Sequence, residues 1–220
     1  MKHIHLDSCD STQDYLKEQL AQGQSEELLI SCENQTQGHG RNQKKWEQLP
    51  HSLYFSFIIT PHEKVTWTAI ELSVIISDYF FTRFGEELKL KWPNDIYDSR
   101  SKKCGGILVQ QSHQKNIAGI GLNLESNQDW GGIFEKSPTQ FSKKEWCADI
   151  VEYIAQNRIA NTNDLRMRFL NRCMHYERQV SITEGDETHA GIFLGLGDWG
   201  EALLKDEQKT HHLYNGSLRW

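Results

Sequence analysis

The chain has 220 residues, 37% hydrophobic and 25% charged, which excludes a disordered segment and fits one large domain or a domain with a small module. The formal net charge of −6 argues against a nucleic-acid-binding protein, which usually presents a basic surface to phosphates. There is no apolar run of membrane-spanning length and no signal-peptide core at the N-terminus, so we expect a cytoplasmic protein that does not bind membranes.

The cysteines give no sign of a disulfide framework. Their number is odd, their positions are scattered, and no two form a CxxC pair, so we expect free thiols in a reducing compartment. The ten histidines include no HExxH motif and no histidine-rich tract. We therefore expect no protein-bound metal.

The first 85 residues predict three strands and two helices. Ile4 and Leu6 alternate with polar residues, which is typical of a strand at 2–7. A helix is expected at 10–23, capped by Ser11 or Thr12. The remaining predicted elements are strands at 26–35 and 51–60 and a long core helix at 65–85, with Trp67, Ile70, Val74, Ile75 and Phe81 near helical spacing and Gly85 at its C-cap.

Further along, Pro93 ends a short strand at 88–92, and two strands at 105–112 and 116–124 are joined by the polar turn HQKN as an antiparallel hairpin. Ser142 and Glu145 form a capping-box pattern before a helix at 142–156, and a second helix is expected at 163–176. The mixture of hairpins and helices predicts an α+β fold rather than βαβ units.

After about Tyr176 the pattern changes to short apolar runs separated by the turn sequences EGD, GDWG, DEQK and NG. Such a pattern is typical of a small antiparallel barrel. We therefore predict one domain at 1–175 and a second at 176–220.

The sequence GHGR, ending at Arg41, combines glycines that allow close backbone approach with an arginine suited to phosphate or carboxylate. Because the loop contains neither GxxxxGK[ST] nor GxGxxG, it favours a plain surface loop when taken alone. Lys91 stands at a strand end before Pro93, where a functional lysine and an exposed structural one are equally expected.

Glycines interrupt both strands of the predicted hairpin, at Gly105 and Gly106 and again at Gly119 and Gly121. A glycine inside a strand usually marks a bulge or a close backbone approach. Because both strands lack side chains there, we favour a slot for a flat ligand over two bulges. No GxSxG or Cys/His nucleophile signature is present, which favours charge-stabilised chemistry such as adenylate formation over covalent catalysis.

Taken together and in this order, four stretches resemble biotin protein ligases, also called biotin–[acetyl-CoA carboxylase] ligases. They read GHGRNQKKW, KWPNDIY, KCGGILVQ and GIGLN, beside approximate family patterns of GRGRxGRxW, KWPND, KxxGILVE and GxGxN. The early DSTQ resembles the start of the family's first helix, and YNGSLRW resembles the end of its SH3-like C-terminal module. KWPND followed by GGILV is specific, and the resemblance covers nearly the whole chain.

The resemblance implies the fold of class II aminoacyl-tRNA synthetases, a mixed or antiparallel sheet with flanking helices, followed by a small SH3-like β-barrel. It implies an ATP-dependent biotin–protein ligase of the monofunctional type, without the N-terminal DNA-binding domain of bifunctional members. Biotin and ATP, the latter with Mg²⁺, would give biotinyl-5′-AMP and pyrophosphate. A lysine of a biotin carboxyl carrier protein or domain would then accept the biotin. A homodimer is compatible with this reading, and no nucleic acid is expected as a partner.

The resemblance also assigns residues by position. It implies that Arg41 is catalytic and contacts the phosphate, and that Lys91 is catalytic and contacts the reacting carboxylate and phosphate. The residues implied to bind biotin are Ser11, Thr12, Gln35, Gly38, His39, Gly40, Gly106, Gly119 and Gly121. Those implied to bind the nucleotide are Arg41, Lys44, Trp46, Asn123 and Trp130, with Trp46 more an anchor of the loop than a ligand contact.

The chain departs from the family pattern at several positions. His39 stands where the family usually has arginine, and an unperturbed histidine is mostly neutral at pH 7. Lys44 replaces an arginine, Gln43 replaces a glycine, and Gln110 or Gln111 stands near a usual glutamate. We interpret these changes as tuning. A lipoate–protein ligase of the same superfold and a non-catalytic ligand-binding module are the alternative functions.

Overall fold

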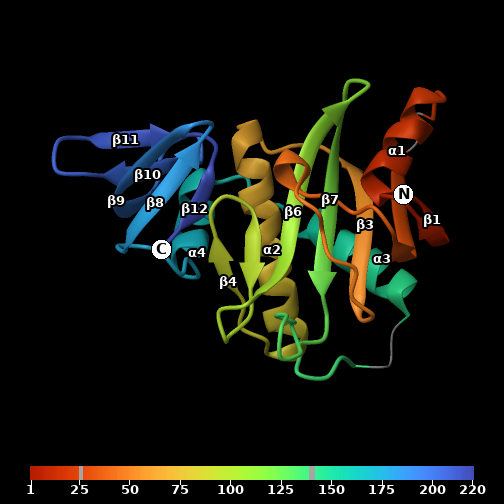
Figure 1. Ribbon diagram of the computed structural model, residues 1–220. Helices are drawn as coiled ribbons and strands as arrows, with labels where there is room; N and C mark the ends of the chain where they lie inside the picture. Colours follow the sequence, from red (N-terminus) through yellow and green to blue (C-terminus); the bar gives the residue numbers. More distant parts are fainter. Residues whose placement is uncertain (25–26, 139–141) are drawn as a thin grey trace.

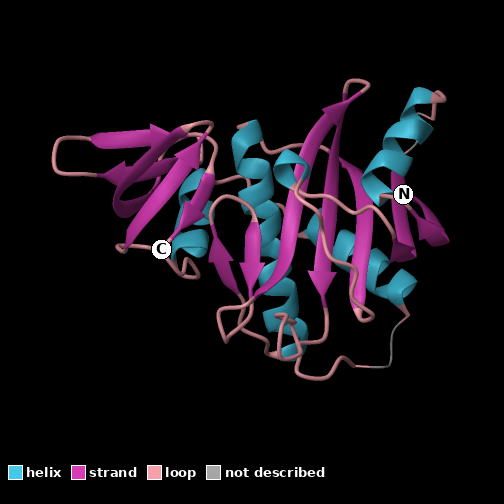
Figure 2. Ribbon diagram, viewed as in Figure 1, coloured by secondary structure: helices cyan, strands magenta, loops and turns pink. Residues whose placement is uncertain are grey.

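The computed structural model describes residues 1–24, 27–138 and 142–220, which form two β-sheets and four α-helices (Figures 1 and 2). The larger sheet has seven strands in the order β1-β2-β3-β7-β6-β5-β4, and only β1 and β2 pair in parallel. Its strands are β1 (Lys2–Cys9), β2 (Leu28–Gln35), β3 (Ser52–Ile59), β4 (Lys89–Lys91), β5 (Asp95–Tyr97), β6 (Lys103–Ser112) and β7 (Lys115–Asn123). Glu26, placed in the second predicted strand, lies outside the described residues.

Helices cover both faces of this sheet (Figure 1). Side chains on β2 alternate between the faces, so that Leu28 and Ile30 pack with α1 while Leu29 joins the core under the other helices. The glycines of β7 lie on the α1 face, because a Cβ on Gly119 would meet Gln13 of that helix. The helices are α1 (Thr12–Ala21), α2 (Thr68–Phe84), α3 (Lys143–Gln156) and α4 (Thr162–Leu170), with short 3-10 turns η1 (Arg41–Gln43) and η2 (Val65–Trp67).

Capping signals fix the ends of these helices as predicted. The Ser11 hydroxyl accepts a hydrogen bond from the Asp14 backbone N–H at the start of α1. Ser142 and Glu145 form the complete capping box of α3. Gly85 ends α2 with a φ of 74°, a left-handed conformation that glycine adopts without strain.

The smaller sheet is antiparallel, with the strand order β11-β10-β9-β8-β12. It continues the hydrophobic core of the larger sheet, since Val180 and Phe193 belong to the same buried cluster as the α2 side chains. Two buried tryptophans also cross the junction, because Trp92 Nε1 donates to the Gly200 carbonyl at 3.0 Å and Trp67 Nε1 to the Asp198 carbonyl at 3.1 Å. The strands are β8 (Gln179–Glu184), β9 (Glu187–Leu196), β10 (Ala202–Lys205), β11 (Thr210–Leu213) and β12 (Ser217–Arg219).

Several details of the fold differ from the sequence-based predictions, and one is β5 (Asp95–Tyr97), a strand that was not predicted. The β1–α1–β2 segment is a parallel βαβ unit, because α1 carries the chain back across the sheet face. Phe81 is 52% exposed, since Tyr79 and Phe80 take the core positions of that turn. The last predicted helix ends at Leu170 rather than at 176, because the segment after it pairs with β4: Leu90 N–H donates to the Arg172 carbonyl.

No helix within the described ranges is both long enough and apolar enough to cross a membrane.

Candidate active site

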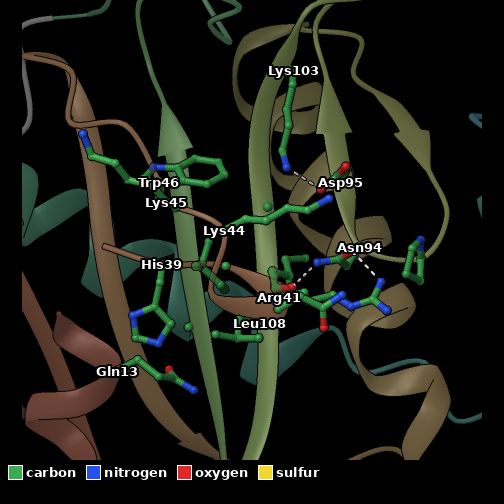
Figure 3. Close-up of a pocket in the computed structure, with 18 of the residues that line it drawn as sticks. Gln13, His39, Arg41, Lys44, Lys45, Trp46, Asn94, Asp95, Lys103 and Leu108 are labelled. Atoms are coloured by element: carbon green, nitrogen blue, oxygen red, sulfur yellow. Dashed lines mark hydrogen bonds and ion pairs between the residues drawn. The ribbon is translucent and has the colours of Figure 1, made fainter. Parts of the chain in front are cut away.

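A cavity of about 280 Å³ opens on the α1 face of the larger sheet. Its walls come from parts of the chain that are far apart in sequence: the start of α1, Gln35 of β2, a hairpin at 38–46, Ser56 of β3, the β4–β7 region and residues 216–219 of the smaller sheet. Figure 3 shows part of this arrangement, with the labelled hairpin residues His39, Arg41, Lys44 and Trp46 in front of the strands of the larger sheet. The cavity thus unites the four stretches that the sequence singled out.

One wall is bare backbone. Gly106 and Gly121 are direct partners across β6 and β7, and with Gly119 they form what we call the glycine slot. The Trp46 ring lies over this slot, since a Cβ on Gly121 would stand only 2.8 Å from Trp46 Cε2 and one on Gly106 3.0 Å from Cζ3. Among the described residues Trp46 Nε1 is buried without a hydrogen-bond partner. The Trp46 ring therefore covers the flat surface of the slot, and its indole N–H is an unused donor.

Polar side chains close one end of the glycine slot. Thr12 N–H donates to Gln35 Oε1 at 2.9 Å, and the hydroxyls of Thr12 and Ser56 are 2.9 Å apart. Gln13 Nε2 donates to Gln110 Oε1 at 3.3 Å, whereas Gln13 Oε1 is buried and has no partner in the described part of the chain. This end offers both donors and acceptors to a polar ring system.

Cations gather at the other end. The cavity is lined there by Arg41, Lys44, Lys91 and Lys103. Asp95 is the one acidic residue among the described residues that line it. Lys103 Nζ is 2.6 Å from Asp95 (Figure 3). Burial lowers the pKa of both Arg41 and Lys91, and the nearby Asp95 carboxylate acts in the opposite direction. An anion bound here would offset the desolvation of these cations.

The 38–46 hairpin is held by its own backbone and by contacts at its tip. Trp46 N–H donates to the Gly38 carbonyl at 2.8 Å and Gly40 N–H to the Lys44 carbonyl at 2.8 Å. Arg41 Nη1 lies 3.4 Å from both Asn94 Oδ1 and the Gly216 carbonyl. The hairpin therefore reaches from the glycine slot to the smaller sheet.

Two of the residues that differ from the family pattern, His39 and Lys44, line the cavity. His39 Nδ1 is 3.6 Å from Asp14 Oδ2, which ties the hairpin to the start of α1. Lys44 Nζ lies 3.4 Å from Ser217 Oγ. Of the two glutamines considered, Gln110 contacts Gln13, while Gln111 is exposed. The side chain of Gln43 lies outside what the structure describes.

The structure brings most of the expected site residues together but leaves three outside the cavity lining. Gly38 lies beside it, where a Cβ would overlap the Gln35 amide. Asn123 is buried and accepts from Ser52 Oγ at 3.0 Å, and Trp130 is 41% exposed. Their roles toward a ligand stay predictions. The expected residues that do line the cavity are Ser11, Thr12, Gln35, His39, Gly40, Arg41, Lys44, Trp46, Lys91, Gly106, Gly119 and Gly121.

Other residues that line the cavity were not predicted as site residues from the sequence. Gln13 follows the DSTQ signal directly, and Ser56 is a polar residue inside an apolar strand, so both carried a weak sign of function. Asn94 and Asp95 lie in the KWPND motif but were given no role of their own. Residues 216–219 belong to YNGSLRW, which indicated the end of the second unit but not a part of the site, because only the docking of the smaller sheet brings it to the cavity.

A family model described as the biotin/lipoate A/B protein ligase family matches residues 6–127. The bifunctional ligase/repressor BirA of Bacillus spizizenii is 28% identical over 135 residues, and that match spans 57% of this chain but only 41% of the relative. BirA of Escherichia coli is 25% identical over 220 residues, or 90% of this chain and 67% of the relative.

Among solved structures, the biotin protein ligase from Aquifex aeolicus in complex with biotin and ATP matches with a TM-score of 0.82 and 26% identity. The match covers 99% of this chain and 98% of that one. The two sheets and their helices are therefore arranged as in that protein.

Proposed function

This chain belongs to the biotin/lipoate A/B protein ligase family, and we propose that it is an ATP-dependent ligase that activates biotin as biotinyl-5′-AMP and transfers it to a protein lysine. The observation that carries the proposal is the union, in one cavity, of a bare glycine slot and a cationic end containing Arg41 and Lys91. A flat uncharged ring system fits the first, and phosphate fits the second. The Aquifex relative binds the same two molecules, biotin and ATP.

In this proposal the Trp46 ring moves off the glycine slot, which it covers at Gly106 and Gly121, and the biotin ring system takes its place. Its ureido group meets the polar end, where Ser11, Thr12 and Gln35 are close to one another. The unpartnered Gln13 Oε1 is an acceptor that a ureido N–H would satisfy, which would remove the cost of its burial. The valeryl carboxylate would then point toward the cations.

Adenylation is the attack of that carboxylate on the α-phosphate of ATP, with pyrophosphate as the leaving group. Negative charge accumulates on the phosphate oxygens in the transition state, and fixed cations in a water-poor site stabilise it. We assign this role to Arg41 and Lys91, both partly buried at the cationic end. Mg²⁺ would enter with ATP as part of the substrate.

The 38–46 hairpin would shield the mixed anhydride from water. In the second step the amine of an acceptor lysine attacks the biotinyl carbonyl and AMP leaves with its phosphate on the cations. The acceptor would be the biotin carrier protein or domain of a biotin-dependent carboxylase, the class that the names of related ligases imply. A homodimer stays a prediction.

We further propose that the architecture is that of class II aminoacyl-tRNA synthetases with an SH3-like second unit, divided into 1–175 and 176–220. The antiparallel core of the larger sheet and the five-stranded antiparallel sheet starting at Gln179 support this division. The shared hydrophobic cluster indicates that the two units pack as one body.

The test is exchange of labelled pyrophosphate into ATP in the presence of biotin or of lipoate. Biotin-dependent exchange is expected, with none above background for lipoate. Exchange with lipoate alone would identify a lipoate ligase, and a folded chain that exchanges with neither acid would support a non-catalytic binding module.

A further inference from the structure

Lys91 is held by aromatic rings and has no ion pair among the described residues. Its Nζ lies 4.7 Å from the centroid of the Trp220 ring and 5.7 Å from that of Tyr97, and 3.4 Å from the Tyr97 hydroxyl. Cations are attracted to the faces of such rings. Asp95, the nearby carboxylate, is engaged at 2.6 Å by Lys103 instead.

Trp220 reaches Lys91 from the smaller sheet, directly after β12. Its ring also stacks on the buried His175, with centroids 6.1 Å apart and an interplanar angle of 12°. His175 is held in turn by an edge contact to Phe193 of β9, at 4.3 Å. The Trp220 ring is thus held by His175, which itself packs on β9.

The segment that carries His175 also fixes the strand that carries Lys91. Leu90 N–H donates to the Arg172 carbonyl at 2.8 Å, and Met174 N–H donates to the Leu90 carbonyl at 3.1 Å. Because backbone and ring contacts converge on β4, the position of the Lys91 amine depends on the junction between the two sheets.

An aromatic face has a particular advantage over a carboxylate here. Other cations stand around Lys91, and the proximity of Lys103, Lys44 and Arg219 disfavours its charged form. A carboxylate partner would hold the amine but would also neutralise it toward an incoming phosphate. A ring holds the ammonium by its quadrupole and leaves its net charge available.

We propose that Trp220 is a positioning residue for adenylation, holding the Lys91 ammonium between its own ring and that of Tyr97 so that it meets the reacting carboxylate and phosphate. The proposal rests on the proposed function of Lys91. It makes the smaller sheet part of the first chemical step through a side chain that need not touch either substrate.

The variant Trp220→Leu removes the ring, and Trp220→Phe keeps a smaller aromatic face. The matched control is Trp199→Leu, because Trp199 is also 52% exposed and also contacts a lysine. The Nζ of that lysine, Lys64, lies 5.2 Å from the ring centroid, but Lys64, unlike Lys91, is not among the cavity-lining residues. In the full chain, kcat for biotin-dependent pyrophosphate exchange should fall about tenfold for Trp220→Leu. KM for biotin should stay within about twofold, and Trp220→Phe should recover most of the rate.

A double-mutant cycle separates positioning from a general structural role. In a Lys91→Ala background, Trp220→Leu should cause no further loss, whereas independent effects would multiply and would overturn the proposal. Unchanged kcat in Trp220→Leu, or an equal loss in Trp199→Leu, would also overturn it.

A measurement without substrate keeps this proposal apart from the proposed function. The side-chain methylene NMR signals of Lys91, assigned through Lys91→Arg, should lose their ring-current shift in Trp220→Leu but not in Trp199→Leu. If they do not move in Trp220→Leu, Trp220 does not hold Lys91, whatever the chain catalyses. If they move but the wild-type chain shows no exchange with biotin, the proposed function fails, and the catalytic role given to Trp220 fails with it.

Discussion

Adding one methyl group at Gly121 tests the glycine slot directly. A Cβ at this position would stand 2.8 Å from Trp46 Cε2 and 3.0 Å from both Cζ2 and Nε1. Ordinary carbon contacts are about 3.5–4.0 Å, so the ring must move by roughly 0.7 Å or more. In Gly121→Ala the methyl group would occupy the surface on which we place the biotin ring system.

The neighbouring strand offers a control of the same chemistry on the opposite face. A Cβ on Gly105 would meet Leu122 Cδ2 at 2.7 Å and Ile96 Cβ at 3.1 Å, inside the hydrophobic core. Overpacking a core costs about 1–3 kcal/mol, so Gly105→Ala should lower the free energy of unfolding by that amount. Trp46 is only partly buried and can shift outward, so Gly121→Ala should stay within about 1 kcal/mol of the wild type.

Isothermal titration calorimetry with biotin and urea unfolding together distinguish the two variants. Biotin affinity should fall about tenfold or more for Gly121→Ala, since a misfitted methyl in a binding pocket costs about 1–3 kcal/mol. Gly105→Ala should bind biotin nearly as the wild type does while it remains folded. Wild-type affinity in Gly121→Ala would refute the placement of biotin on the glycine slot.

Three further predictions follow from the charges. Lys91→Ala should slow biotin-dependent pyrophosphate exchange by about 10²- to 10³-fold, and a near-normal rate would make Lys91 structural. Glu71 is 1% exposed, and its Oε1 accepts a hydrogen bond from Arg158 Nε at 2.8 Å. Glu71→Gln should therefore lower the free energy of unfolding in urea by about 3 kcal/mol. A loss of under 1 kcal/mol would contradict a stabilising role for this ion pair. Burial, with Lys91 and Arg178 nearby, lowers the pKa of His175 to about 3. Because the unfolded chain takes up this proton near pH 6.5 and the native chain does not, stability should fall by about 2 kcal/mol more in the wild type than in His175→Gln between pH 6.5 and 5. Urea unfolding at the two pH values measures this, and an equal change in the free energy of unfolding for the wild type and His175→Gln would contradict it.

Much of the larger unit could be predicted from local signals. The helix starts at Ser11 and Ser142, the stop at Gly85 and the hairpin of β6 and β7 follow from capping, left-handed glycine and turn chemistry, and all are confirmed. The parallel pairing of β1 and β2 could not be foreseen, because periodicity gives a strand but not its partner. The identification of the family from the four motifs is confirmed by the family match.

The site shows the same limit. The glycines, Arg41 and Lys91 carried signals of their own because each breaks a local rule or stands at a strand end. The contributions of Gly216 and Trp220 are visible only in three dimensions, since they depend on how the smaller sheet docks against β4. Their stretch, YNGSLRW, indicated the second unit, but nothing in it indicated a place in the site.

The central claim, that this cavity makes an acyl-adenylate from biotin, is tested most directly by native mass spectrometry of the chain after incubation with biotin and MgATP. The account predicts a noncovalent complex with the mass of biotinyl-5′-AMP, absent when ATP is replaced by a nonhydrolysable α,β-methylene analogue. A folded chain that retains only unreacted biotin or ATP, or that forms an adenylate only when lipoate replaces biotin in the incubation, would contradict it.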